Sequence, residues 1–314
     1  MIGGRICVVG GGVIGSLYAA HLSRVAEVWV LTRRAGHAAA LERDGIRVTG
    51  RAAFTARVHA TDDPIALPDP DLTIIATKGT QLDAAAAGLH RCLEGSTVVT
   101  VQNGLGAEQI VRRYGEWPLV SGVTFMSGTR HSDTHVEYIL DTETWLGPYN
   151  GIPFERVEEI ASVLEGAGLK ARAFPDLKPA QWSKLIFNAT VNAVAALTGL
   201  PHDRHFAEEA ETGDLGHLVH ALMDEGKAVA AAAGIELHED PWEMNVLATQ
   251  RGSAHYPSML EDVEARRPTE IELITGSLVR EAERLGVSVP LHTALYRLIK
   301  AKEASWEPET GQSK

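Results

Sequence analysis

A lysine and two asparagines interrupt an otherwise apolar helical pattern in the second half of the chain. In WSKLIFNATVNAVAAL, residues 182–197, the residues Lys184, Asn188 and Asn192 recur every four positions, so on a helix they form one narrow polar stripe. A stripe facing water would more often hold Glu, Lys or Arg, because asparagine is only a middling helix former. A solvent-facing stripe and a stripe lining a ligand cleft are the two alternatives, and the residue types favour the cleft.

A glycine-rich turn near the N-terminus has the spacing of a dinucleotide-binding motif. VVGGGVIGS places Gly10, Gly12 and Gly15 after an apolar strand pattern and before a helical one. The first glycine permits a tight turn, the second lets the backbone approach a pyrophosphate, and the third lets the helix pack on the strand. A turn without a ligand is the alternative. The expected cofactor contacts are Gly10, Gly11, Gly12, Val13, Ile14 and Gly15.

The end of the next predicted strand favours NADP(H) as the cofactor. An NAD-preferring site usually has an acidic residue there, which accepts the ribose hydroxyls. The sequence VLTRR supplies Arg33 and Arg34 instead, and guanidinium groups suit a 2′-phosphate. The alternative is a solvent-exposed basic loop that contacts no ligand.

Two later strand patterns also end in polar residues. TIIATKGTQ delivers Lys78 and Gln81, and TVVTVQNGLG delivers Asn103, followed by Gly104 and Gly106. Ligands of doubly wound sheets lie beyond the carboxyl ends of the strands, so these side chains are candidates for contact. An exposed lysine and a plain Asn-Gly turn are the alternatives. Together with the glycine motif, the two patterns favour a site.

A second polar set lies in YPSMLEDVEARRPTEIELITG, which contains Ser258 and Glu270. Thr269 and Glu272 have the spacing of a capping box, and Glu270 would then complement the dipole of the first helical turn. Spacing alone therefore does not single out Glu270 as functional. We expect no metal site, because no metal-ligand spacing occurs among His217, His220, His238 and His255.

The elements that must position these residues change character along the chain. Strand patterns at 5–10, 27–32, 71–77, 96–104, 118–128, 134–140, 143–147 and 170–174 are interleaved with helical patterns at 13–24, 81–92 and 154–166. This alternation predicts a parallel sheet covered on both faces. Beyond residue 175, Ala/Leu/Glu-rich helical periodicity dominates. We predict an α/β protein with an N-terminal Rossmann-type doubly wound sheet, residues 1–175, and an all-α C-terminal domain, residues 176–314, with a frayed C-terminal tail.

Composition limits the class of protein and its partners. The chain has 314 residues, is 45% hydrophobic, and carries a formal net charge of −12, which disfavours nucleic acid and membrane surfaces as partners. Two cysteines, Cys7 and Cys92, suggest no disulfide framework. With no signal segment and no membrane-length apolar run, we expect a cytoplasmic protein with a small-molecule partner. A homodimer is compatible with these features.

Five motifs, in order, carry a resemblance to a known family. GGGVIG, ATKGTQ, VQNG, WSKLIFNATVNAVAAL and SMLEDVEARRPTEIELITG together resemble the ketopantoate reductase (2-dehydropantoate 2-reductase) family over nearly the whole chain. The resemblance implies a Rossmann domain, a helical domain and an active site in the cleft between them. It also implies an NADP-dependent oxidoreductase acting on a CH–OH/C=O group, which reduces 2-dehydropantoate to (R)-pantoate in pantothenate and coenzyme A biosynthesis.

The resemblance also implies roles for individual residues. Lys184 matches the family's general acid, and Glu270 matches the glutamate that supports catalysis and substrate orientation. Asn103 matches an asparagine at the nicotinamide and substrate, Lys78 a lysine near the reacting centre and cofactor, and Arg33 the arginine for the 2′-phosphate.

Further matches concern the substrate. Asn188, Asn192 and Ser258 match substrate-binding positions. His255 departs from the asparagine often found three residues before the matched serine, which keeps open a relative that reduces another 2-keto acid or an imine. A non-catalytic NADP(H)-binding sensor is the other alternative, although a binder has no need of a positioned acid such as Lys184.

Overall fold

The computed structural model describes residues 4–90, 92–209, 213–250 and 256–306. The chain divides into two compact units. Unit 1 consists of Met1–Gln102 and Ala107–Leu177, and unit 2 consists of Asn103–Gly106 and Lys178–Lys314. A four-residue segment that follows a strand of unit 1 thus packs as part of unit 2.

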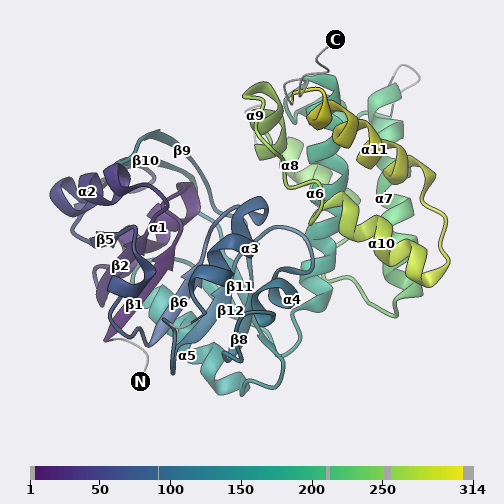
Figure 1. Cartoon of the computed structure of the whole chain (residues 1–314). Coiled ribbons are helices and arrows are strands. Elements are labelled where there is room, and N and C mark those ends of the chain that lie inside the picture. Colours follow the sequence, from purple (N-terminus) through teal and green to yellow (C-terminus); the bar gives the residue numbers. More distant parts are fainter. Residues whose placement is uncertain (1–3, 91, 210–212, 251–255, 307–314) are drawn as a thin grey trace, which may run out of the picture. The chain divides into compact units, whose positions relative to one another are not determined.

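Unit 1 combines two sheets with flanking helices (Figure 1). Its strands are β1 (Arg5–Val9), β2 (Glu27–Leu31), β3 (Ile46–Gly50), β4 (Phe54–Ala56), β5 (His59–Thr61), β6 (Leu72–Ile75), β7 (Thr97–Thr100), β8 (Leu119–Thr124), β9 (Ser127–Ser132), β10 (His135–Leu140), β11 (Thr144–Tyr149) and β12 (Ala171–Ala173). Its helices are α1 (Val13–Leu22), α2 (Ala35–Asp44), the 3-10 turn η1 (Pro64–Ala66), α3 (Gly79–Gly88), α4 (Ala107–Arg112) and α5 (Phe154–Gly166).

The larger sheet has the strand order of a doubly wound fold. Its order is β12-β11-β8-β7-β6-β1-β2-β5. The strands from β5 through β8 pair in parallel, whereas β11 runs antiparallel to β8 and β12 runs parallel to β11. From β1 the chain goes outward through β2 to β5 and then returns to β6 on the other side of β1. The strand order therefore reverses between β1 and β6, which is where such sheets bind ligands.

Both faces of this sheet are covered by helices. Successive side chains of a strand point to opposite faces, so alternate residues of β1 pack in different cores. In β1, Ile6 and Val8 belong to a core that includes residues of α1 and α5, whereas Cys7 and Val9 join residues of α3 and α4. Burial raises the pKa of the Cys7 thiol to about 12. Each buried aliphatic side chain contributes about 1.5–3 kcal/mol relative to exposure. The smaller sheet, ordered β4-β3-β10-β9, packs over α1.

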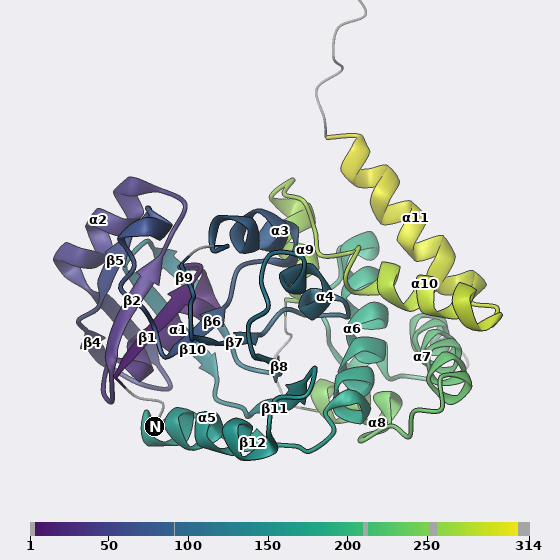
Figure 2. The same ribbon diagram turned by 60° about the horizontal axis from the view of Figure 1, so that its bottom comes forward.

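Unit 2 is built from helices around α6. These are α6 (Lys178–Thr198), the 3-10 turn η2 (Arg204–Phe206), α7 (Asp214–Ala232), α8 (Pro241–Thr249), α9 (Ser258–Glu264), α10 (Thr275–Leu285) and α11 (Pro290–Ala304). Helix α6 contacts each of the helices α7 to α11, and Figure 2 shows it among them. Nowhere in the ranges the structure describes does a helix combine the length and apolarity needed to cross a membrane.

The structure confirms the predicted fold class and corrects one local prediction. The expected capping box of Thr269 and Glu272 does not form, because α10 begins only at Thr275. The Thr269 amide and hydroxyl both donate to Glu303 Oε1 at 2.7 Å. Glu272 instead accepts from Tyr296 and pairs with Lys300. A glutamate from α11 thus makes the contact that the sequence assigned to a local residue.

The glycine-rich turn joins β1 to α1. Gly10 has φ +106°, a conformation that favours glycine, and a Cβ on Gly15 would lie 1.8 Å from the Gly10 carbonyl oxygen. By contrast, a Cβ on Gly12 would meet no atom within 4 Å. Gly15 is therefore needed for close packing of the helix, whereas Gly12 leaves its surroundings open.

This contrast predicts that one added methyl group destabilises the protein at Gly15 but not at Gly12. Gly15→Ala should lower the free energy of unfolding by about 1–3 kcal/mol, because the added carbon collides with backbone. Gly12→Ala, the matched control, should change stability by less than about 0.5 kcal/mol. Urea denaturation of both variants measures the difference. Equal stability of the two variants would contradict the packing described for the turn.

Candidate functional site

The end of β6 adjoins the glycine turn, and Gln102 joins the end of β7 to it. A Cβ on Gly10 would lie 2.9 Å from the Thr77 amide nitrogen, so the end of β6 adjoins the turn. Gln102 Nε2 donates to the carbonyl oxygens of Ile75 and Thr77 at 2.8 and 3.0 Å, and so holds the end of β7 to the end of β6. Lys78, an exposed residue, is the N-cap of α3.

Gln81 lies one turn into α3 and is half-buried. The backbone N–H of Gln81 donates to the Lys78 carbonyl oxygen at 2.9 Å, which fixes the start of the helix. Lys78 and Gln81 therefore lie at the start of α3, which follows β6, the strand paired with β1.

The two arginines after β2 differ in their surroundings. Arg33 is exposed on the loop between β2 and α2. Arg34, the N-cap of α2, forms an ion pair with Asp133 at 2.5 Å. One of the two arginines expected to bind a 2′-phosphate, Arg34, is thus paired with the Asp133 carboxylate from the β9–β10 connection.

The stripe on α6 has two buried asparagines and a half-buried lysine. The side chains of Asn188 and Asn192 are only 9% and 7% exposed, and Lys184 is half-buried. Burial lowers the pKa of Lys184 from 10.5 to about 8, and the negative charge of Glu270 opposes part of this shift. An ammonium whose pKa lies near neutrality is suited to donate a proton. The residue types that made the stripe unusual are therefore in protein surroundings and not in bulk water.

A chain of polar contacts joins three of the predicted residues in unit 2. Asn103 Nδ2 donates to Glu270 Oε2 at 3.3 Å, and Asn188 Nδ2 donates to Asn103 Oδ1 at 3.5 Å. Glu270 also influences Lys184 electrostatically. The structure thus brings together residues that are 167 positions apart in sequence, Asn103 and Glu270.

Backbone contacts fix the segment that carries Asn103. The Leu105 amide donates to the Leu273 carbonyl at 2.9 Å. Gly104 has φ +93°, and a Cβ there would lie 1.8 Å from the same oxygen. Because Leu273 and Glu270 share one short turn, with the Leu273 amide donating to the Glu270 carbonyl at 3.2 Å, this approach sets the spacing of Asn103 and Glu270.

The remaining substrate candidates are placed less closely. Ser258 is exposed at the first residue of α9, a helix that packs against α6. Within the part of the chain that the structure describes, Ser258 makes no hydrogen bond to Asn188 or Glu270. His255 lies outside the described residues.

Two residues near the glycine turn were missed from sequence. Gln102 bridges β6 and β7, and an amide directly before Asn103 at the end of an apolar strand was an available signal. His37 is 4% exposed, and a Cβ on Gly11 would lie 2.6 Å from its Cε1 atom. No local pattern distinguishes His37 within the Ala-rich segment of α2.

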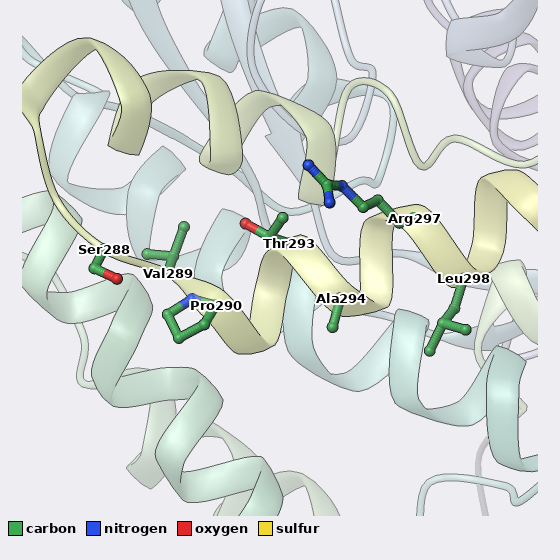
Figure 3. A pocket seen from close by; sticks show the side chains of 7 residues that line it. All are labelled: Ser288, Val289, Pro290, Thr293, Ala294, Arg297 and Leu298. Atoms are coloured by element: carbon green, nitrogen blue, oxygen red, sulfur yellow. The ribbon is translucent and has the colours of Figure 1, made fainter.

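Other surface features lie apart from these residues. A depression in unit 2 is lined by Ser288, Val289, Pro290, Thr293, Ala294, Arg297 and Leu298 (Figure 3). None of these is a predicted site residue. Within the ranges that the structure describes, no three His, Cys, Asp or Glu side chains are grouped so as to hold a metal ion.

The turn after β1 fits a dinucleotide. No side chain caps the N-terminus of α1 at Gly12, and the space a Cβ would occupy there is open. Backbone amides at such a terminus bind phosphate oxygens. The turn also lies at the reversal of strand order between β1 and β6. These observations make the turn a suitable place for the pyrophosphate of a pyridine dinucleotide.

Comparison with protein families accounts for most of the chain. The family described as ketopantoate reductase PanE/ApbA matches residues 6–151. The family described as ketopantoate reductase PanE/ApbA C terminal matches residues 176–303. The two matches follow each other along the chain and leave only short segments uncovered.

Individual relatives extend over nearly their full lengths. A 2-dehydropantoate 2-reductase of Vibrio cholerae is 30% identical over 96% of this chain and 99% of its own. The structure of 2-dehydropantoate 2-reductase from Methylococcus capsulatus superposes with a TM-score of 0.84 at 29% identity, covering 98% of this chain and 100% of that chain. D-mandelate dehydrogenase, solved with NADH and anilino(oxo)acetate, shares the fold, with a TM-score of 0.87 at 22% identity over 96% of this chain and 99% of that one.

The doubly wound sheet, the glycine turn and these matches define an oxidoreductase that acts on a CH–OH or C=O group. Within that class, the chain belongs to the ketopantoate reductase family. The family resemblance inferred from the five sequence motifs is thereby confirmed.

The Gly104 contact predicts a specific sensitivity. Gly104→Ala should lower the free energy of unfolding by at least about 2 kcal/mol, because the methyl group meets the Leu273 carbonyl and the backbone is strained. Gly286→Ala is the control: Gly286 has φ +69° but nothing within 4 Å of an added Cβ. It should cost roughly 1–2 kcal/mol from backbone conformation alone.

Urea denaturation of the two variants isolates the collision. If Gly104→Ala were no more destabilising than Gly286→Ala, the Gly104 approach to Leu273 would not set the packing of this segment.

Proposed function

We propose that the chain catalyses the NADPH-dependent reduction of 2-dehydropantoate to (R)-pantoate, as a cytoplasmic step of pantothenate and coenzyme A biosynthesis. The observation that carries the proposal is the half-buried Lys184 ammonium, with a pKa of about 8, in the same unit as the hydrogen-bonded Glu270 and Asn103. The names of full-length relatives support the choice of substrate.

The cofactor would be held by the turn after β1 and the residues around it. Gly10, Gly11 and Gly12 would bind the pyrophosphate through their backbone, with Val13, Ile14 and Gly15 in the first turn of α1. Arg33 would bind the 2′-phosphate, and Lys78, Gln81 and Asn103 would complete the contacts. When bound, NADPH supplies the hydride for the keto carbon.

Lys184 would supply the proton in this reaction. Its ammonium would donate a hydrogen bond to the keto oxygen, stabilise the negative charge that develops there, and then transfer the proton to give the hydroxyl group. Burial supports this role because it brings the pKa down to about 8, so that proton loss costs little near neutral pH. Solvent would return a proton to the neutral amine.

Glu270 and the amides would orient the substrate. Glu270 would offset the positive charge of Lys184 and accept from a substrate hydroxyl. Asn188 and Asn192, with Asn103 and Ser258, would bind polar groups of the keto acid. A substrate lacking those groups would leave buried amides unpaired, at a cost of about 1–3 kcal/mol each.

An assay of NADPH oxidation tests the proposal. Purified protein should show saturable turnover with 2-dehydropantoate and NADPH, and a lower kcat/KM with NADH. Parallel assays use other 2-keto acids, including one with an aromatic side chain, and a cyclic imine. Turnover confined to one of these would replace the proposed substrate, and cofactor binding with no turnover on any of them would indicate a sensor.

The role of Lys184 gives a sharper prediction. Lys184→Ala should reduce kcat by about two to four orders of magnitude, as expected for removal of a general acid. Lys178→Ala is the matched control, because Lys178 is an exposed residue at the start of the same helix. Near-normal kcat in Lys184→Ala would refute the assignment.

The pH dependence of the wild-type enzyme provides a second measurement of the same role. Because burial lowers the pKa of Lys184 to about 8, the proton is present below that pH and is lost above it. The rate of reduction should therefore fall as pH rises through about 8, and approach a tenfold loss per pH unit. A rate that stays level to pH 9.5 would contradict Lys184 as the acid.

A further inference from the structure

The β9–β10 connection brings a carboxylate to the loop after β2. Asp133 lies between these strands, and its Oδ1 atom is 2.5 Å from Arg34 Nη2 and 3.8 Å from Arg130 Nη1. The side chains of Arg34, Arg130 and Asp133 are 57%, 44% and 32% exposed. The guanidinium of Arg34 lowers the pKa of the Asp133 carboxyl. Asp133 is therefore an accessible anion paired with arginine.

His37 places this pair beside the glycine turn. Its Nε2 atom is 2.9 Å from the main-chain oxygen of Asp133. The same ring packs on Gly11, where an added Cβ would lie 2.6 Å from Cε1. One buried imidazole thus contacts both the dinucleotide turn and the Asp133 backbone, which fixes where the carboxylate lies relative to the turn.

The location gives Asp133 a chemical consequence for the cofactor. The adenine ribose of a dinucleotide lies at the end of the second strand, where an acid accepts its hydroxyls and arginines bind a 2′-phosphate. Here the acid comes from a distant hairpin instead of from β2. A 2′-phosphate that reached Arg34 would meet the Asp133 carboxylate, which has the same sign of charge.

We propose that Asp133 is a specificity-determining residue, which competes with the 2′-phosphate for Arg34 and Arg130 and so reduces the preference for NADP(H) over NAD(H). The inference rests on the proposed function for its cofactor class. Arg33, which is exposed and outside this ion pair, would supply the remaining preference for the phosphate. Because Arg34 is paired with Asp133 and Arg33 is not, the preference for NADP(H) over NAD(H) is reduced and not abolished.

The test compares Asp133→Asn with Glu137→Gln. Both remove one carboxylate from the same hairpin, but Glu137 pairs with His131 at 2.8 Å. Titration calorimetry measures the Kd of 2′,5′-ADP and of 5′-ADP, and steady-state kinetics measure kcat/KM for NADPH and NADH. Asp133→Asn should raise the preference for the phosphorylated nucleotide by roughly three- to tenfold in both measurements. Glu137→Gln should leave it unchanged.

The outcomes separate this inference from the proposed function. An unchanged or reduced preference in Asp133→Asn would overturn the role of Asp133, since a carboxylate that merely orients Arg34 would aid phosphate binding. Wild-type protein that binds neither nucleotide would overturn the proposed function itself. Asp133→Ala provides a second variant without the amide, and the thermal transition of each variant establishes that it is folded.

Discussion

The candidate site of unit 2 depends on one backbone approach, that of Gly104 and Leu105 to the carbonyl of Leu273. A side chain at position 104 would fill the space that the carbonyl occupies. The approach brings the Asn103 amide to the Glu270 carboxylate, and Glu270 in turn acts on the charge of Lys184. A main-chain contact, which is independent of the side chain of Leu273, thus determines which polar groups meet.

The second constraint is the partial burial of the Lys184 ammonium. Removing a charged lysine from water is unfavourable, and the cost appears as a lowered pKa. The negative charge of Glu270 opposes part of this shift, and the pKa of Lys184 is about 8. Desolvation thus favours the neutral amine, and the carboxylate of Glu270 favours the ammonium. The pKa of Lys184 therefore reflects both its burial and the charge of Glu270.

Much of this architecture follows from local patterns in the sequence. The short β-rich runs RICVV and EVWVL predicted strands, and the spacing of Gly10, Gly12 and Gly15 predicted the turn between β1 and α1. The stripe on α6 was recognised because lysine and asparagine are unusual in an apolar helix. These features could be predicted because each depends on residues that are close together in the sequence.

Contacts between segments that are distant in the sequence could not be predicted in this way. Glu303 replaces Glu272 as the partner of Thr269, and Asp133 reaches Arg34 from 99 residues away. Helix α2 and strands β3 to β5 were missed as well, because their short segments have little hydrophobic periodicity. Such elements are stabilised by neighbours that only the tertiary structure supplies.

The membership of Asn103–Gly106 in unit 2 has a consequence for how the protein can be divided. The polypeptide passes from one unit to the other after Gln102, after Gly106 and after Leu177. A recombinant fragment beginning at Lys178 would contain the described helices of unit 2, α6 to α11, but would lack the Asn103 amide that Glu270 binds and the loop that contacts Leu273. A faithful isolated version of unit 2 would need those four residues grafted back as a separate peptide or through a new linker. No single cut in the polypeptide therefore separates the two units.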